Sequence, residues 1–90
     1  MMPNCRVRLY IVVGRKIIKS DEECGAETVR DVLEHLRRRL GDDFERDVYD
    51  GVLKDGYALV LNKTPLTAEQ LDTPIDDGDT LFLFTALAGG

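Results

Sequence analysis

The sequence predicts one α+β domain, in which a mixed sheet of four or five strands packs against one main helix. Three patterns in the 90 residues predict it. Apolar and polar residues alternate over 7–13, apolar residues recur at helical spacing over 28–40, and a short apolar run at 80–84 follows an Asp-Gly turn signal. A chain of this length forms a single domain. We therefore expect one folded unit over 1–85 and a flexible C-terminal tail over 86–90.

The first two strands are expected to form a hairpin. The alternating segment 7–13 has one apolar face, and Gly14-Arg15 supplies the turn. A second, short strand begins at Ile17-Ile18. The polar stretch 19–27 that follows is expected to be a loop.

The main helix is predicted over about 28–40. Thr28 is a suitable N-cap, and Asp31 places a negative charge in the first turn, where it stabilises the helix dipole. Gly41 is the expected stop. The apolar stripe that faces the sheet consists of Val29, Val32, Leu33, Leu36 and Leu40.

One further strand is predicted between the helix and the last strand. Residues 42–50 are expected to be irregular or to form a short helical turn, and Asp55-Gly56 is a turn signal that leads into a strand over 57–61. The stretch 62–79 is interpreted as a connection, from which isolated apolar residues reach the core. These residues are Leu66, Leu71 and Ile75.

The last strand, 80–84, is apolar on both faces, which is not typical of an edge strand with one wet face. We expect it to pair in parallel with the first strand at the centre of the sheet. Leu81 and Leu83 then face the helix, and Phe82 and Phe84 face away from it. Two exposed aromatic rings on an open face predict a partner-binding patch. The alternative is that one ring folds back onto a loop.

Composition excludes several classes of function. A formal net charge of −5 argues against nucleic acid as the main partner, and it suits either a basic protein surface or simple solubility. No stretch is long and apolar enough to be a signal peptide or a membrane span. Cys5 and Cys24 lack the Cys-x-x-Cys spacing of metal or thioredoxin-type sites, and we expect a reduced pair in the cytoplasm, with one disulfide as the alternative.

No group of residues predicts an independent enzyme. The sequence lacks a phosphate-binding Gly-x-x-x-x-Gly-Lys loop, a nucleophile with a defensible histidine partner, and a metal cluster. His35 is interpreted as a solvated or partly packed helix residue. Tyr10, Tyr49 and Tyr57 are expected at the rim of the core.

The chemistry is expected at the tail, Leu87-Ala88-Gly89-Gly90. Glycine has no Cβ, so a double glycine can pass through a narrow channel and present the carboxylate of Gly90 inside another protein's active site. There the carboxylate can attack the α-phosphate of ATP, and a sulfur nucleophile can convert the acyl-adenylate into a thiocarboxylate. The partner would supply the catalytic groups and exclude water. The alternative is a disordered end without a function.

Residues 71–84, followed by the tail 87–90, resemble the C-terminal part of the MoaD/ThiS family, which are ubiquitin-like β-grasp sulfur carriers. An Asp-Gly-Asp turn, a short apolar strand and a Gly-Gly ending are shared. Residues 28–33 resemble the family's helix start, and 59–63 its Val-Asn-Gly strand end, although lysine follows the asparagine here. Thr85-Ala86 stands where the family often has Pro-Pro, which makes this tail less stiff.

The resemblance implies that an E1-like enzyme adenylates Gly90 with ATP, and that a sulfur donor then forms the thiocarboxylate, with no cofactor bound by the carrier itself. It implies a protein co-substrate for cofactor biosynthesis: molybdopterin or tungstopterin first, thiamin next. In the molybdopterin branch the chain resembles the small synthase subunit, and its tail enters the large subunit. Leu87 is the expected anchor of that tail, and Ala88 and Gly89 keep it narrow. Two alternatives stay open, a ubiquitin-like modifier joined through Gly90 to lysines and a passive β-grasp interaction domain.

Overall fold

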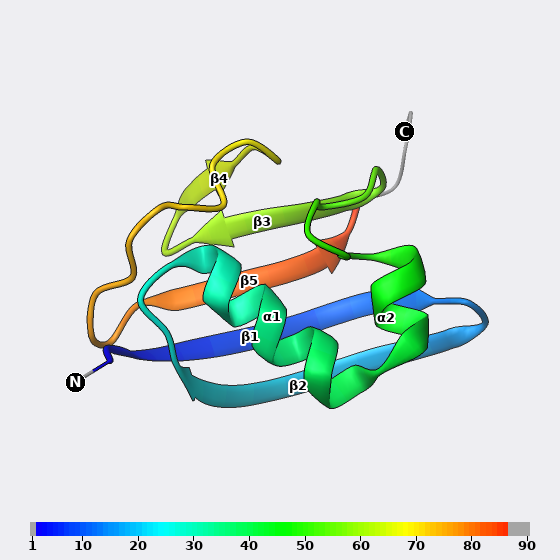
Figure 1. Cartoon of the computed structure of the whole chain (residues 1–90), viewed down its shortest axis with the longest axis horizontal. Helices are drawn as coiled ribbons and strands as arrows, with labels where there is room; N and C mark the ends of the chain where they lie inside the picture. Colours follow the sequence, from blue (N-terminus) through cyan, green and yellow to red (C-terminus); the bar gives the residue numbers. More distant parts are fainter. Residues whose placement is uncertain (1, 87–90) are drawn as a thin grey trace.

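A five-stranded mixed sheet forms one layer of the molecule, and two helices form the other (Figure 1). The computed structural model describes residues 2–86. The strands are β1 (Asn4–Val13), β2 (Lys16–Gly25), β3 (Tyr57–Leu61), β4 (Thr64–Leu66) and β5 (Thr80–Thr85), and the helices are α1 (Val29–Leu40) and α2 (Asp42–Asp47). No helix within the described part of the chain is long and apolar enough to cross a membrane.

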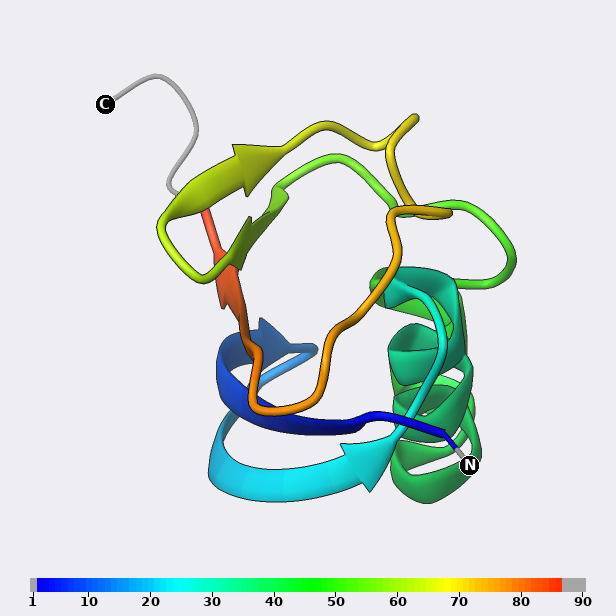
Figure 2. The same ribbon diagram turned by 90° about the vertical axis from the view of Figure 1, so that its left-hand side faces the viewer.

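The central strands of the sheet are the first and the last of the chain, as predicted. The strand order is β2-β1-β5-β3-β4, and β1 and β5 are the only parallel neighbours among the described strands, with Val7 opposite Leu81 and Leu9 opposite Leu83. In a view turned by 90° from Figure 1, both helices lie on one side of the sheet (Figure 2). No helix formed by residues 2–86 covers the opposite face of the sheet, here called the open face.

The second strand is far longer than predicted. The expectation of a loop over 19–27 is wrong for 19–25, because β2 pairs residue for residue with β1 as far as Gly25, which lies opposite Asn4. Because β2 lies at the edge of the sheet, it needs few apolar residues, and its charged residues protect that edge from pairing with other chains. Gly14, with a φ of 62°, takes the first central position of the two-residue turn, as glycine does in type II′ hairpins.

A short strand, β4, lies within the stretch that the sequence analysis assigned to a connection. It pairs with β3 across the two-residue loop Asn62-Lys63, with Val60 opposite Pro65. Proline is tolerated there because β4 is an edge strand and one of its backbone sides makes no ladder bonds. Asn62 has a positive φ of 59°, a conformation that asparagine adopts more readily than other residues with a Cβ.

Helix α1 begins and ends where its local signals predict. The hydroxyl of Thr28 accepts a hydrogen bond from the Asp31 N–H (3.3 Å), and the Asp31 carboxylate accepts one from the Thr28 N–H (3.2 Å). These two bonds form a capping box. At the other end, Gly41 has a φ of 83° and donates its N–H to the carbonyl of Arg37. Residues 42–47 then form the short helix α2.

The core lies between α1 and the inward face of β1, β5 and β3. Tyr49 is fully buried, so its predicted place at the core rim is wrong, and its hydroxyl donates to the Glu34 carboxylate at 2.9 Å. Leu71 and Ile75 fill the core from the connection, as predicted. The buried residues are Cys5, Val7, Leu9, Ile11, Val13, Cys24, Ala26, Val29, Val32, Leu33, Leu36, Phe44, Val48, Tyr49, Leu59, Leu71, Ile75, Leu81 and Leu83.

Candidate functional site

The end of β5 is tied firmly into the sheet before the chain reaches its Gly-Gly segment. The Thr85 hydroxyl accepts a hydrogen bond from the Val12 N–H (2.7 Å), and the Ala86 N–H donates to the Gly56 carbonyl (2.8 Å). The predicted reactive tail, Leu87, Ala88, Gly89 and Gly90, lies outside the described residues. Its role therefore stays a prediction, whereas Thr85 and Ala86, the last described residues, are fixed beside β1 and the start of β3.

The aromatic pair of β5 lies on the open face, as the alternation of the strand predicts. Leu81 and Leu83 are fully buried, whereas Phe82 exposes 38% of its surface and Phe84 is half-buried. The two rings pack edge to face, with centroids 5.0 Å apart and planes at 60°. This arrangement is a favourable one for aromatic pairs and presents a firm apolar surface. The partner-binding role of the pair stays a prediction.

Three exposed apolar side chains extend this surface onto the neighbouring strands. Tyr10 lies opposite Phe84 in the register of β1 and β5, and Val12 lies opposite Ile17 in the register of β1 and β2. All three are exposed, Ile17 by 66%. We call the five residues Tyr10, Val12, Ile17, Phe82 and Phe84 the apolar band. The β1 and β2 members of this band were not predicted from the sequence, although Tyr10 and Val12 occupy even positions of the alternating segment 7–13, opposite in direction to its core face.

The Asp-Gly-Asp turn positions the start of β5. The Asp79 carboxylate accepts a hydrogen bond from the Asn62 side-chain NH₂ group (3.0 Å), and the side-chain oxygen Oδ1 of Asn62 accepts one from the Thr80 N–H (3.1 Å). Asp77 accepts one from the Asn4 N–H (2.8 Å). The turn therefore joins the beginning of β1, the β3–β4 loop and β5, and it sets where the aromatic pair lies.

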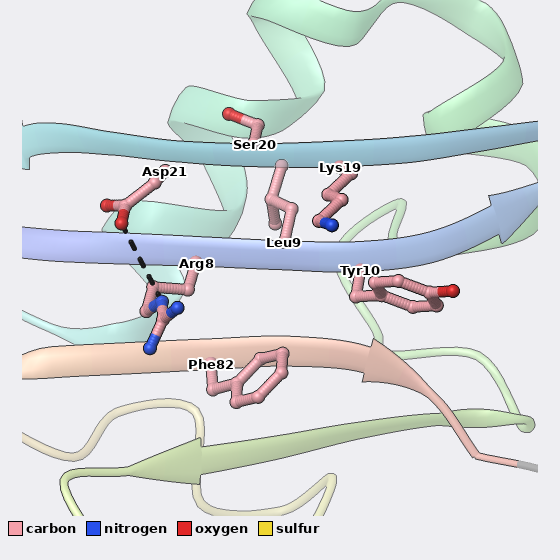
Figure 3. A pocket seen from close by; sticks show the side chains of 7 residues that line it. All are labelled: Arg8, Leu9, Tyr10, Lys19, Ser20, Asp21 and Phe82. Atoms are coloured by element: carbon pink, nitrogen blue, oxygen red, sulfur yellow. Dashed lines mark ion pairs between the residues drawn. The ribbon is translucent and has the colours of Figure 1, made fainter.

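A hollow of about 400 Å³ opens beside Phe82 on the open face (Figure 3). Arg8 and Tyr10 border it from β1, and Lys19 and Asp21 from β2. The Arg8 guanidinium lies 3.7 Å from the Asp21 carboxylate. Positive charge and aromatic surface thus meet in one place.

The buried thiols are unsuited to nucleophilic chemistry. Cys5 and Cys24 lie opposite each other on the core side of β1 and β2, and both are free. Burial raises the pKa of the Cys5 thiol to about 11 and also raises the pKa of Cys24. His35, half-exposed on α1, lies 3.4 Å from the Glu22 carboxylate. Within residues 2–86, no cluster of histidine, cysteine and carboxylate side chains could hold a metal ion.

A model of the ThiS family matches residues 10–90, which is most of the chain and includes the Gly-Gly segment. The chain belongs to the ThiS family. The match extends over β5, the Asp-Gly-Asp turn and the predicted reactive tail. No curated protein matches the sequence of this ThiS-family chain.

Solved structures agree with the assignment. The small archaeal modifier protein 1 (SAMP1) of Methanosarcina acetivorans is 18% identical, with a TM-score of 0.73 over 100% of this chain and 99% of its own. Haloferax volcanii SAMP1 is 27% identical, with a TM-score of 0.61 over 97% and 99%. The CysO chain of the Amycolatopsis orientalis BexX/CysO complex is 23% identical, with a TM-score of 0.64 over 93% and 99%.

These likenesses identify the fold as a ubiquitin-like β-grasp. Together with the ThiS family match, they place the chain in the class of ubiquitin-like sulfur carriers and modifiers. The fold and the resemblance predicted from the sequence are confirmed.

Proposed function

We propose that this protein is a sulfur carrier whose working group is the carboxylate of Gly90. An E1-like partner binds the open face, takes the tail into its active site and activates the carboxylate with ATP. The observation that carries the proposal is the ThiS family match over residues 10–90, a span that includes the Gly89-Gly90 pair. The carrier acts as a protein co-substrate, because the activating groups come from the partner.

The proposed chemistry has two steps. A carboxylate oxygen of Gly90 attacks the α-phosphate of ATP, pyrophosphate leaves, and the product is an acyl-adenylate. Hydrosulfide, or a donor that delivers its equivalent, then attacks the acyl carbon and AMP leaves, which yields the thiocarboxylate. The carrier holds no bound cofactor in this scheme, and water must be kept from the adenylate by the partner.

Two features of the described residues support this assignment. The apolar band gives a partner an exposed aromatic surface of the kind that often dominates binding energy. The bonds at Thr85 and Ala86 hold the end of β5 beside that band.

For the compartment, we propose the cytoplasm, because the free, buried thiols fit a reducing environment.

For the acceptor we propose cofactor biosynthesis, with the pterin precursor of molybdopterin or tungstopterin first and the thiazole of thiamin next. In the first case the large subunit of molybdopterin synthase is a further partner, which receives the tail. The thiocarboxylate form can be supplied separately to purified synthase large subunit and to thiazole synthase. The enzyme that consumes the thiocarboxylate identifies the pathway that receives the sulfur.

Intact mass spectrometry tests the proposal. The intact mass of the purified protein is first measured to check that Gly90 is the terminal residue. The protein is then incubated with the E1-like enzyme of the same organism, ATP and sulfide. We expect a mass increase equal to the exchange of one oxygen for sulfur, confined to the C-terminal peptide. Deletion of Gly90 should abolish the increase. A wild-type protein that never gains sulfur or AMP would contradict the proposal.

A protein modifier is the second candidate, because Haloferax volcanii SAMP1, 27% identical over almost the whole chain, carries the name of a modifier protein. In that case the acyl-adenylate is resolved by a lysine amine, which forms an isopeptide bond. Conjugates of higher mass with Gly90 attached to target lysines would favour this function. A passive β-grasp interaction domain would instead bind its partner equally well without Gly90.

A further inference from the structure

The open face has a charge balance opposite to that of the whole chain. The alternation and register of the strands place three cations and two carboxylates on it, so it is net positive, whereas the chain carries −5. These five residues are Arg6, Arg8, Lys19, Asp21 and Glu23. A face of this kind attracts negative charge even though the protein as a whole repels it.

The positive charge is concentrated at the hollow beside Phe82 (Figure 3). One carboxylate, Asp21, is shared between two guanidinium groups, at 3.8 Å from Arg6 and 3.7 Å from Arg8. Lys19 makes no ion pair with any residue in 2–86. The hollow therefore keeps an excess of positive charge that the described side chains do not neutralise.

The same hollow has apolar walls. Tyr10 and Phe82 line it from adjacent strands, and Phe82 also belongs to the apolar band. An occupant that suits the hollow therefore combines a carboxylate with a short apolar stem, as aspartate and glutamate side chains do. A small anion alone gains little here, because Arg8 is more than half exposed and its charge is screened by water and salt. A protein surface that also covers Phe82 excludes that water.

We infer that the hollow binds an aspartate or glutamate side chain on the surface of the adenylating partner. The inference rests on the proposed function, because it states what that partner presents next to Phe82. Lys19 and Arg8 supply the countercharge. Asp21 opposes the incoming carboxylate and therefore weakens the complex.

The test is the affinity of the full-length protein for the E1-like enzyme of the same organism, measured by isothermal titration calorimetry. Lys19→Gln should weaken binding by about two- to fivefold, and Asp21→Asn should tighten it by a similar factor. Two matched controls make the same charge changes on the helix side: Arg38→Gln on α1 and Asp42→Asn on α2, both exposed. The controls should leave the affinity unchanged. Lys19→Gln should also reduce the dependence of affinity on salt concentration.

The outcomes separate this inference from the proposed function. If the wild type is adenylated at Gly90 but Lys19→Gln and Asp21→Asn bind like their controls, the inference fails and the proposed function stands. If the wild type neither binds the enzyme nor gains AMP, both fail. Resonances of Lys19 and Phe82 that shift with inorganic phosphate alone, as strongly as with the enzyme, would make the hollow a small-anion site and overturn the inference.

Discussion

At the scale of single residues, Cys5 and Cys24 show how the sheet controls reactivity. An acyl-adenylate at the tail is open to attack by any thiolate within reach. Both thiols of this chain are buried, and the raised pKa values keep them protonated at neutral pH. A protonated thiol is a poor nucleophile. In the proposed reaction, neither thiol would therefore compete with the sulfur donor for the acyl-adenylate.

The pKa of Cys5 leads to a prediction for alkaline stability. The folded chain holds this pKa at about 11, whereas the exposed thiol has 9.0, so the unfolded chain loses its proton first as pH rises. This stabilisation is complete below pH 9 and is lost between pH 9 and 11. At 1.36 kcal/mol per pKa unit, Cys5 accounts for about 2 to 3 kcal/mol of the loss.

Urea unfolding at a series of pH values measures this contribution. Cys5→Ala should be less stable than the wild type at neutral pH but should lose less of its stability between pH 9 and 11. The difference between the two slopes isolates Cys5 from other groups that titrate in the same range. Identical slopes would contradict the prediction.

Asn62 carries both a backbone and a side-chain role. Asn62→Gly keeps the positive φ and removes the side-chain bonds to Asp79 and Thr80, so we expect a loss of about 1 to 2 kcal/mol in unfolding free energy. Asn62→Ala also forces a Cβ residue into the left-handed region, which should cost about 1 kcal/mol more. Chemical denaturation of the two variants measures both effects. A glycine variant as stable as the wild type would show that the side-chain bonds contribute nothing.

At the scale of elements, α1 depends on its N-terminal capping box. Thr28→Ala removes the hydroxyl that accepts from the Asp31 N–H, and we expect it to reduce the unfolding free energy by about 1 kcal/mol. Thr28→Ser keeps the hydroxyl and serves as the control, with a stability close to that of the wild type. Urea denaturation followed by circular dichroism compares the three proteins. Equal stability of the alanine and serine variants would show that the Thr28 cap does not stabilise α1.

At the scale of the whole molecule, the fold separates two surfaces. The helices cover one face of the sheet (Figure 2), where the aliphatic side chains are buried, and the strand register places the apolar band on the open face. The bonds at Thr85 and Ala86 hold the end of β5 against Val12 of β1 and Gly56, which precedes β3. The partner that we propose for the apolar band would therefore lie close to the end of β5.

Phe82 should contribute strongly to that association. Phe82→Ala is expected to weaken binding of the E1-like enzyme by about tenfold or more, because the ring is exposed and supported by Phe84. Val52→Ala is the matched control, since Val52 is 62% exposed in the loop before β3, outside the apolar band. Calorimetric titration measures both, and circular dichroism checks that each variant is folded. Equal affinities would place the binding surface elsewhere.

Elements whose signals are local could be predicted from the sequence alone. Thr28, Asp31 and Gly41 mark the helix through contacts within one turn of the chain, and the run 80–84 is recognisable as a central strand because apolar residues occupy both of its faces. The family motif around the Asp-Gly-Asp turn and the Gly-Gly ending could also be read directly.

The remaining features depend on contacts between distant parts of the chain. The segment 19–25 resembles a loop because its charged residues need no burial, and it becomes a strand only when β1 offers a complete set of hydrogen-bonding partners. Tyr49 looks like a rim residue, yet the fold buries it and supplies Glu34 for its hydroxyl. Ile17 joins Phe84 in one apolar band, and Lys19 meets Phe82 at one hollow, through the register of three strands. Strand register is set by the pairing of segments that are distant in the chain, so it cannot be predicted from the pattern within one segment.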